Sequence, residues 1–192
     1  VFAEFAQLVD TDACMDYLIV NTFFGNGDVM NQRFWHAQDG SVAWRPLLFD
    51  LDWCMRFNSA YRDTFSRYFS RNGSAAGNET ITNMDIFYGL KKNAAWREAF
   101  IDRFIEAAYT YFDTDRVLAL FDETVAQMEP EMVRHIVRWH THRNVNTWLG
   151  QTEALRNALE KRRDIALREM ADAFGLSDAE LQTRIEAYTS TH

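Results

Sequence analysis

The sequence has little cysteine, proline or glycine, with two, two and eight residues respectively in a chain of 192. The two cysteines, Cys14 and Cys54, cannot build a disulfide framework, and the lack of a Cys-x-x-Cys pair argues against a structural zinc site. So few glycines and prolines exclude a collagen-like chain and Gly-rich linkers. With 47% hydrophobic and 15% aromatic residues, the chain has enough apolar material for one sizeable core. We therefore expect residues 1–192 to form a single domain.

A surplus of positive charge is also missing, because 28 acidic residues outnumber 20 basic ones and give a formal net charge of -8. Nucleic-acid backbones attract basic surfaces, so we expect no nucleic-acid partner. The sequence shows no apolar run of membrane-spanning length and no signal-peptide pattern, so we expect no membrane insertion. The first residue is Val1 rather than Met, which leads us to expect a processed chain or a piece of a longer one.

The first strong pattern is a run of apolar residues at helical spacing over residues 11–24, which predicts a largely buried helix. Thr11 and Asp12 are the candidate N-caps, and Gly25 should end the helix. The following residues, Asn26-Gly27-Asp28, should form a polar turn. This pattern places a carboxylate in a loop directly after a buried helix.

Two strand-like runs flank Gln38-Asp39-Gly40, a turn sequence typical of a β-hairpin. The second run contains Pro46, which fits an edge strand or the start of a strand. It continues as Leu47-Leu48-Phe49, and this continuous apolar stretch predicts a buried strand. The strand should end at Asp50-Leu51-Asp52 and present two carboxylates there.

Residues 53–83 lack a clear period and mix Asn, Ser, Gly and Arg with aromatic residues, so we expect a long irregular loop. Within it, Phe65, Tyr68 and Phe69 fit core packing or loop anchoring better than an exposed binding surface. Residues 84–192 carry apolar residues at helical spacing, and we expect a helical bundle there. The predicted fold class is therefore mostly α (α+β), a helical bundle with one small β-hairpin.

Several helix boundaries in the second half of the chain follow from single residues. One helix should start after Asp113-Thr114 and end at Pro130, because proline breaks helical hydrogen bonding. A separate helix should follow over residues 131–139. A long helix should stop at Gly175, and Ser177 with Glu180 forms the capping-box pattern of a terminal helix.

Asp28, Asp50 and Asp52 are the residues that indicate chemistry. Asp28 follows a helix and the other two follow a strand, with only a hairpin between them, so the three can converge on one edge of the hairpin. Carboxylate oxygens hold Mg²⁺ while phosphate oxygens complete its shell, and a separate aspartate can orient or deprotonate a hydroxyl group. Asn31 could supply another oxygen to the same metal. The alternative is structural, because such aspartates are commonly caps or turn residues.

The order of these residues matches the catalytic half of a protein kinase, in which a helix, a loop with Asp then Asn, a hairpin and an Asp precede an irregular segment. The HRD and DFG triplets of general kinases are absent. His135, His140 and His142 raise the question of a second metal site. Arginines interleave with them and no carboxylate or cysteine is spaced to match, which argues against zinc.

The runs DTDACMDYLIVNTFFGNGD, NQRFW and WRPLLFDLDW, with a DG turn between the last two, resemble the spore-coat CotH kinase family, an atypical protein kinase-like family. That family has a helix leading to an N-x-D loop, an aromatic strand and a segment similar to W-x-x-x-P-W-D-x-D. Further similar stretches are NAAWREAFIDRF, RHIVRW and VNTWLGQTEALRNALEKRRDIALREM. The likeness extends from about Asp10 to Phe174.

The resemblance implies a protein kinase that uses ATP and Mg (or Mn) to phosphorylate Ser or Thr of a protein substrate. It gives Asp28 the catalytic role and makes Asp50 and Asn31 cofactor-binding and metal-binding residues. Asp52 takes a supporting or second-metal role. Two departures from the family pattern, Phe49 in place of a tryptophan and Cys54-Met55 in place of small residues, concern the shape of the loop. The family implies a spore coat, cell-surface or secreted setting.

The resemblance also implies that this chain is the carboxyl-terminal lobe of a kinase. Kinases hold ATP with an N-terminal lobe that has a Gly-rich loop and a strand lysine, and residues 1–27 are too few to form one. We therefore expect a missing N-terminal lobe as a partner, and a chain that binds ATP weakly and is inactive alone. Residues 1–52 would supply the catalytic-loop helix, the hairpin and the metal-binding segment, and residues 84–192 the helical bundle.

Two other functions fit parts of the sequence. A strand followed by Asp-x-Asp resembles haloacid-dehalogenase-type phosphatases, in which the first aspartate, here Asp50, is a nucleophile. Such enzymes need a doubly wound sheet, for which the helical remainder offers no strands. The other alternative is a non-catalytic coat or surface assembly module of the CotH family.

Overall fold

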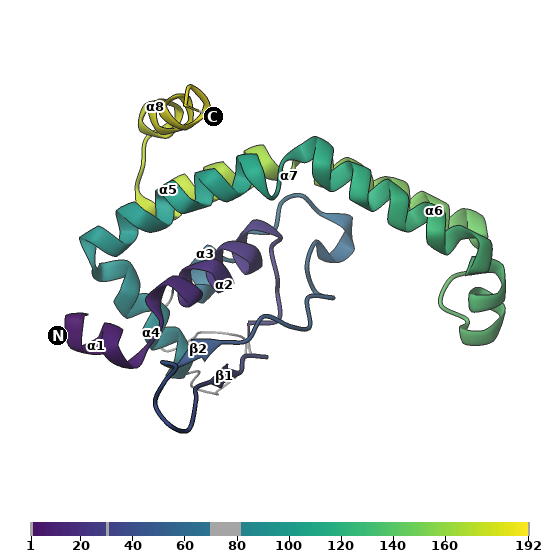
Figure 1. The fold of residues 1–192 in the computed structure, drawn as a ribbon. Helices are drawn as coiled ribbons and strands as arrows, with labels where there is room; N and C mark the ends of the chain where they lie inside the picture. Colours follow the sequence, from purple (N-terminus) through teal and green to yellow (C-terminus); the bar gives the residue numbers. More distant parts are fainter. Residues whose placement is uncertain (1, 30, 70–81, 192) are drawn as a thin grey trace.

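The structure, a computed structural model, describes residues 2–29, 31–69 and 82–191 (Figure 1). Within these ranges the chain is mostly helical and has one small antiparallel hairpin, which confirms the predicted fold class. The helices are α1 (Phe2–Leu8), α2 (Thr11–Phe23), α3 (Phe65–Tyr68), α4 (Thr82–Lys92), α5 (Ala94–Thr110), α6 (Thr114–Trp139), α7 (Val145–Phe174) and α8 (Asp178–Thr189). The strands are β1 (Phe34–Trp35) and β2 (Arg45–Pro46), and a 3-10 turn, η1, covers Arg56–Asn58.

Helix α2 lies in the body of the molecule, and most of its residues are buried. Its N-cap is Asp10, whose carboxylate accepts a 2.8 Å hydrogen bond from the Ala13 amide. The prediction of Thr11 or Asp12 as the cap is wrong, because Thr11 is already helical while Asp10 has the extended backbone that a cap needs. Asp10 also forms an ion pair with Arg45 of β2. One carboxylate therefore starts the helix and ties the hairpin to it.

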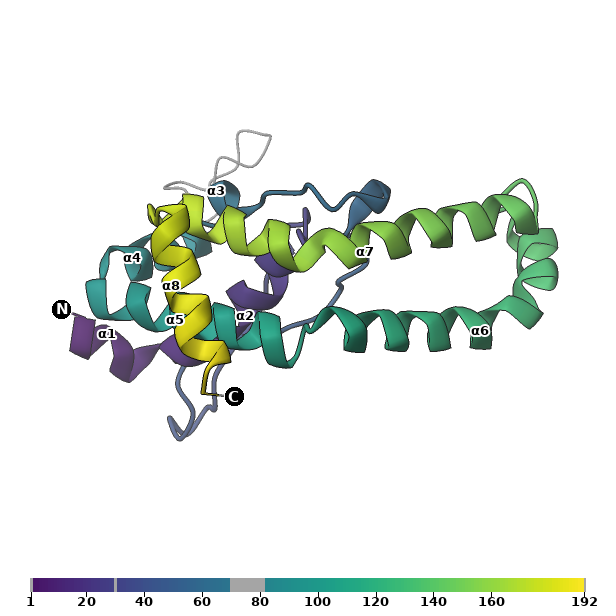
Figure 2. The ribbon, with the colours of Figure 1, turned by 90° about the horizontal axis from the view of Figure 1, so that it is seen from above.

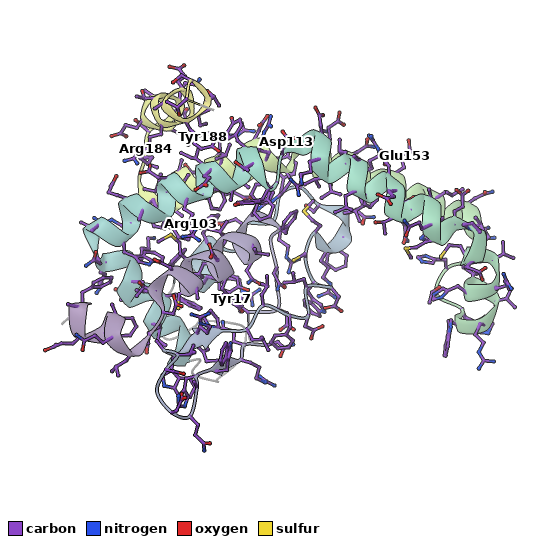
Figure 3. All side chains as sticks on the ribbon, viewed as in Figure 1. Tyr17, Arg103, Asp113, Glu153, Arg184 and Tyr188 are labelled. Atoms are coloured by element: carbon purple, nitrogen blue, oxygen red, sulfur yellow. The ribbon has the colours of Figure 1, made fainter. Side chains whose placement is uncertain are left out.

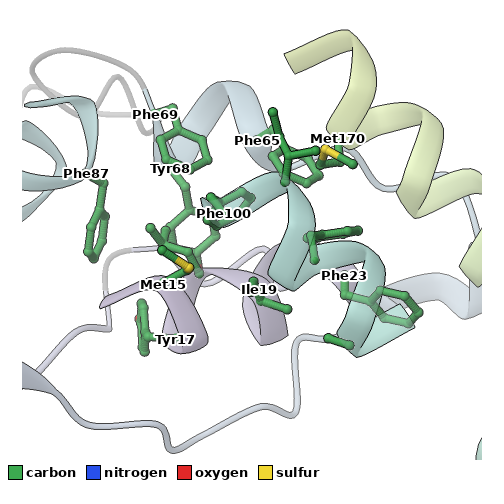
Figure 4. Close-up of a cluster of buried hydrophobic side chains, with 14 of the residues drawn as sticks. Met15, Tyr17, Ile19, Phe23, Phe65, Tyr68, Phe69, Phe87, Phe100 and Met170 are labelled. Carbon is green, nitrogen blue, oxygen red and sulfur yellow. The ribbon is translucent and has the colours of Figure 1, made fainter. Parts of the chain in front are cut away.

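The main core consists largely of aromatic rings that α2, α3, α5 and α7 bring together (Figure 4). Phe100 of α5 is fully buried, and its ring centroid lies 5.8 Å from that of Phe69 and 5.0 Å from that of Phe174. Each such pair adds about 0.5–1.5 kcal/mol to the gain from burial alone. Phe65 and Tyr68 are buried in the same cluster. These aromatic residues therefore serve core packing, as predicted.

The segment that follows the hairpin contains two short helical turns. Residues 53–83, the expected irregular loop, include η1 and α3, and residues 70–81 of it lie outside the described residues. The Met55 amide donates a 2.9 Å hydrogen bond to the Phe24 carbonyl. This bond fixes the first part of the segment against the end of α2.

The hairpin is short, and its register sets Phe34 opposite Pro46 and Trp35 opposite Arg45. The Leu47 amide extends the pairing with a 2.8 Å hydrogen bond to the Arg33 carbonyl. Leu47 and Leu48 are 48% and 45% exposed, so the predicted buried strand over residues 47–49 is wrong. The physical reason is that the described sheet has two strands, so β2 is an edge strand of the kind in which proline is tolerated, and no further strand of the described residues pairs with it. Residues 47–49 therefore do not form a buried strand.

Helix α6 and the first half of α7 form an antiparallel arm that projects from the body (Figure 2). Helix α6 includes Pro130 and is continuous, so the predicted helix end at Pro130 and the separate helix over residues 131–139 are wrong. Figure 2 shows the ribbon of α6 changing direction near its end, as expected where a proline removes one helical hydrogen bond. Beyond Pro130, Met132 and Ile136 pack against Trp148 of α7. This packing stabilises the helix past the proline.

The end of α7 and the start of α8 lie where they were predicted. Helix α7 stops at Gly175, which has a φ of +75°, and α8 starts with a capping box between Ser177 and Glu180. The polar contacts that hold α8 on α5 join Arg184 to Glu98 and Asp102, and Tyr188 to Thr110 (Figure 3).

The architecture bears on two of the functional expectations. None of the described helices is both long and apolar enough to cross a membrane. The described residues form a single antiparallel pair of strands, whereas a haloacid-dehalogenase-type phosphatase needs a doubly wound parallel sheet. The fold therefore contradicts the phosphatase alternative.

Candidate active site

The loop that carries Asp28 begins with a sharp turn at the end of α2. The amides of Gly25 and Asn26 donate hydrogen bonds of 3.2 and 2.7 Å to carbonyls in the last turn of the helix, which is a Schellman motif. Gly25 has a φ of +59°, a backbone conformation that glycine adopts without strain. A Cβ atom on Gly25 would also lie 2.7 Å from the carbonyl oxygen of Arg62. Both restrictions fix the direction in which the loop leaves the helix.

A buried network of side chains then holds the loop in place. The Asn26 Oδ1 atom accepts a 3.0 Å hydrogen bond from the Asp28 amide, and its Nδ2 atom donates one of 2.8 Å to Asn21 Oδ1. Asn21 Oδ1 also accepts a 3.1 Å bond from the Tyr68 hydroxyl, and Asn21 Nδ2 donates to the Tyr17 carbonyl at 2.7 Å. Asn21 and Asn26 are at most 3% exposed. Buried amides satisfied in this way favour one conformation of the loop.

The two tyrosines beside this network are held in their neutral form. Burial raises the pKa of Tyr17 to about 12 and shifts the pKa of Tyr68 upward as well. The negative charge of Asp28 contributes to both upward pKa shifts. The Tyr68 hydroxyl therefore keeps the proton that it donates to Asn21.

The hairpin brings Asn31 and Asp50 together. The Nδ2 atom of Asn31 donates a 2.6 Å hydrogen bond to Asp50 Oδ2 across 19 positions of sequence. This follows from the strand register, which sets residue 31 opposite residue 49 when it is extended. Asp50 has a φ of +55°, a left-handed conformation that costs energy in a residue other than glycine and that recurs at functional sites.

Asp52 lies on an exposed turn that is fixed near the Asp28 loop. The turn is tied down by the hydrogen bond from the Met55 amide to the Phe24 carbonyl, four residues before Asp28. Burial raises the pKa of Cys54 to about 11, and the charge of Asp52 adds to that increase. The structure thus joins Asn31 to Asp50 directly, and ties the turn of Asp52 to the end of α2.

The donor atoms at this edge suit magnesium. Asp50 supplies carboxylate oxygens, and a rotation of the Asn31 amide would present its oxygen in place of its nitrogen; such hard oxygens are the ligands Mg²⁺ prefers. Among the described residues, no three His, Cys, Asp or Glu side chains are placed to hold a metal ion by themselves. A metal here would therefore need oxygens from a second ligand such as a phosphate.

Two arginines that the sequence analysis missed, Arg62 and Arg67, lie beside the Asp28 loop, and Arg56 interacts electrostatically with Arg62. The Nη1 atom of Arg67 donates a 3.0 Å hydrogen bond to the Gly27 carbonyl. The Arg62 guanidinium packs so closely on Gly27 that a Cβ there would lie 1.8 Å from Arg62 Nη2. Burial lowers the pKa of Arg62, and the charges of Arg67 and Arg56 lower it further. Positive charge is therefore concentrated next to the loop.

A fourth arginine, Arg162 of α7, is buried and forms hydrogen bonds with two segments of the site. Its side chain is 1% exposed, and it donates hydrogen bonds to the carbonyls of Thr22, Phe23 and Ala60. It also pairs with Glu169 at 2.7 Å. A cation at the carboxyl end of α2 is favourable because the helix dipole places negative charge there. Arg162 thus joins the end of α2 to the segment that follows Asp52.

The sequence does contain a signal for Arg162. Leu155, Leu159, Ala166 and Met170 form an apolar stripe at helical spacing that passes through position 162, so a charged residue occupies a core-facing position. A buried charge needs partners, and its presence in an apolar stripe indicates a polar contact across the core. No comparable pattern marks Arg62, Arg67 or Asn21, whose partners come from distant segments.

A comparison with protein families gives one match. The family model described as CotH kinase protein matches residues 1–166, which contain the Asp28 loop, the hairpin, Asp50 and Arg162. No curated protein and no solved structure matches the chain. The match covers well over half of the sequence. The chain therefore belongs to the CotH kinase protein family.

Proposed function

We propose that this chain is the carboxyl-terminal lobe of a CotH-type protein kinase that transfers phosphate from ATP to Ser or Thr of a protein substrate. The observation that carries the proposal is the 2.6 Å hydrogen bond between Asn31 and Asp50, because Asn31 follows by three positions the Asp28 whose amide Asn26 holds. Family membership makes phosphoryl transfer the chemistry for which such an arrangement is expected.

Asp28 is the proposed catalytic residue. Its amide is fixed by Asn26 at 3.0 Å, so its position is set before substrate binds, and preorganisation of this kind lowers the barrier to reaction. The substrate hydroxyl oxygen bonds to the γ-phosphorus as the bond to the ADP oxygen breaks, and the hydroxyl proton passes to the Asp28 carboxylate. The product is a phosphorylated Ser or Thr side chain.

Asp50 and Asn31 are the proposed ligands for the metal–ATP complex, with Asp52 in a supporting position. Magnesium bound with ATP neutralises phosphate charge that develops during transfer. Arg62 and Arg67 lie beside the Asp28 loop and add positive charge next to the reacting phosphate. The protein groups thus position ATP on one side and the acceptor hydroxyl on the other.

An N-terminal lobe is the proposed partner that grips the nucleotide. Large apolar side chains stand half exposed around the hairpin and Asp50, as expected of a surface that another lobe covers. They are Trp35, Trp44, Leu47, Leu48 and Trp53. The 192-residue chain alone should bind ATP weakly and show little or no transfer.

The test is phosphoryl transfer by the full-length protein, with radiolabelled ATP, Mg²⁺ and a Ser/Thr-containing acceptor protein. Asp28→Asn and Asp50→Asn each keep the size of the side chain and remove its charge, and each should lower transfer by at least a hundredfold. Asp39→Asn is the matched control, because Asp39 lies in the exposed hairpin turn and bonds only to Ser41 in the described contacts. It should keep wild-type activity.

Full activity in both the Asp28 and Asp50 variants would remove the proposal. The alternative, a non-catalytic assembly module of the same family, predicts no transfer by the wild type and no thermal shift with Mg-ATP in the full-length protein.

A further inference from the structure

The end of the arm has a charge opposite to that of the molecule as a whole. We define the arm tip as residues 132–152, the end of α6, the connecting turn and the start of α7. These 21 residues include three arginines and three histidines but none of the 28 acidic residues of the chain. The arm tip therefore has a formal charge of +3 on a chain whose net charge is -8. The views in Figures 1 and 2 place it at the far end of the arm, away from the body.

The arm tip also exposes large apolar side chains. Val133, Val137 and Trp139 are 59%, 71% and 63% exposed. Their neighbours Met132 and Ile136 are buried against Trp148, so the inner face of this helical segment already packs against α7. The outer face combines exposed valines with arginines.

The exposed valines and arginines at the end of α6 lie on two adjacent faces of that helix. Val133 and Val137 are four positions apart and lie on one face, while Arg134 and Arg138 lie on the next face. Arg134 pairs with Glu131 at the surface, a contact of the kind that contributes little and exchanges readily. A row of two valines therefore runs beside a row of two arginines, both accessible.

We propose that the arm tip is a docking surface for an acidic segment of a partner protein. Carboxylates of that segment pair with Arg134 and Arg138, and its apolar side chains pack on Val133 and Val137. Arg guanidinium groups suit this role because they hold carboxylates through two parallel hydrogen bonds. The charge of the arm tip selects an acidic partner, and the valine row selects one that also has apolar residues.

The arrangement fits a polypeptide better than a lipid surface. Val137 and Trp139 are two positions apart, which separates them by about 200° around a helix of 3.6 residues per turn. Arg138 lies between them and sits over the Trp139 ring at 5.4 Å. A flat membrane cannot take up apolar side chains that point to nearly opposite sides, whereas a peptide can follow one row.

The experiment measures binding of fluorescein-labelled peptides to the 192-residue chain by fluorescence anisotropy. The probe is a short peptide in which glutamate alternates with leucine. The comparison peptides have lysine in place of glutamate, or serine in place of leucine. We expect the Glu/Leu peptide to bind more tightly than both others, and to weaken as NaCl rises from 50 to 500 mM because exposed charges are screened.

Two double variants locate the binding site. Arg134→Ala with Arg138→Ala should weaken the Glu/Leu peptide about tenfold, since two exposed charge pairs are lost. Val133→Ser with Val137→Ser should weaken it to a similar extent. The matched controls are Arg116→Ala with Arg168→Ala, two exposed arginines on the same two helices at the body end, and Leu120→Ser on the shaft of α6, which is 65% exposed. The controls should bind like the wild type.

Circular dichroism spectra that match the wild type would show that each variant folds. Equal peptide binding by the wild type and both arm-tip variants would overturn the proposal. So would binding to phosphatidylserine-containing vesicles without binding to any acidic peptide, which would assign the arm tip to lipid. Concentration-dependent dimerisation that the arm-tip variants abolish would overturn it in favour of a second copy of this chain.

Discussion

Arg162 on α7 donates a 2.9 Å hydrogen bond to the carbonyl of Thr22 on α2, across 140 positions of sequence. The same guanidinium reaches the Ala60 carbonyl and the Glu169 carboxylate. It therefore forms hydrogen bonds, at one buried point, with groups from three separate parts of the chain.

Replacement of Arg162 by methionine should destabilise the fold by about 3–5 kcal/mol, because Glu169 loses its partner and buried carbonyls lose their donor. The free energy of unfolding, measured in urea by circular dichroism, provides the check. Arg168→Met is the control, since Arg168 is exposed on the same helix and should change stability by less than about 0.5 kcal/mol. Similar effects of the two substitutions would contradict the role of Arg162.

Gly25→Ala should cost more stability than Gly40→Ala, although both glycines have a positive φ, of +59° and +76°. A Cβ at Gly40 would have no other atom within 4 Å. That variant should therefore lose only the stability that backbone strain costs, about 1–2 kcal/mol. A Cβ at Gly25 would also press on the Arg62 carbonyl at 2.7 Å, which adds about 1–3 kcal/mol. Urea unfolding of the two variants should separate the cost of backbone strain from the cost of the contact with Arg62. Equal losses of stability would show that Arg62 moves away from the new Cβ atom.

Asn26→Ala should disturb the site more than the fold. It leaves the Asp28 amide without the acceptor that now lies at 3.0 Å, at a cost in stability of about 1–3 kcal/mol. Given the proposed function, kcat for phosphoryl transfer by the full-length protein should fall at least tenfold because Asp28 is no longer held. Asn157→Ala, at an exposed position of α7, is the control. Unchanged kcat in Asn26→Ala would mean that Asp28 needs no such support.

Glu169 should make the fold relatively more stable in acid. Burial raises the pKa of Glu169 above its ordinary value of 4.5 by more than Arg162 lowers it, so the folded state holds this proton more tightly than the unfolded state. The stability due to Glu169 is therefore fully present below pH 4.5 and is lost as pH rises through the higher folded pKa. The difference in unfolding free energy between the wild type and Glu169→Gln should shift against the wild type from pH 4 to pH 7. A shift in the opposite direction would mean that the ion pair outweighs burial.

Local features of the fold could be predicted from the sequence because they depend on neighbouring residues. The capping box of Ser177 and Glu180, the stop at Gly175 and the hairpin around Gly40 each involve only a few adjacent positions. The closeness of Asn31 and Asp50 also follows from local sequence, since a short hairpin leaves little choice of strand register. What these features share is that chain connectivity alone nearly determines them.

The errors arose where distant contacts override local preference. Helix α6 continues past Pro130 because Met132 and Ile136 pack on Trp148 of the opposite helix. In the site, Asn21 meets Tyr68 across 47 positions, a contact that local patterns do not encode. A single sequence therefore indicated the candidate carboxylates but not the residues around them.

The long-range contacts of Arg162 have a consequence for the newly made chain on the ribosome. The groups it binds in the first part of the chain, up to Ala60, are synthesised 102 or more positions before it. At about 5–20 residues per second, this delay is about 5–20 s. During that time the end of α2 and the segment after Asp52 lack the cation that joins them. The junction between the end of α2 and the segment after Asp52 can therefore reach its final geometry only after α7 has emerged, however early its own residues are made.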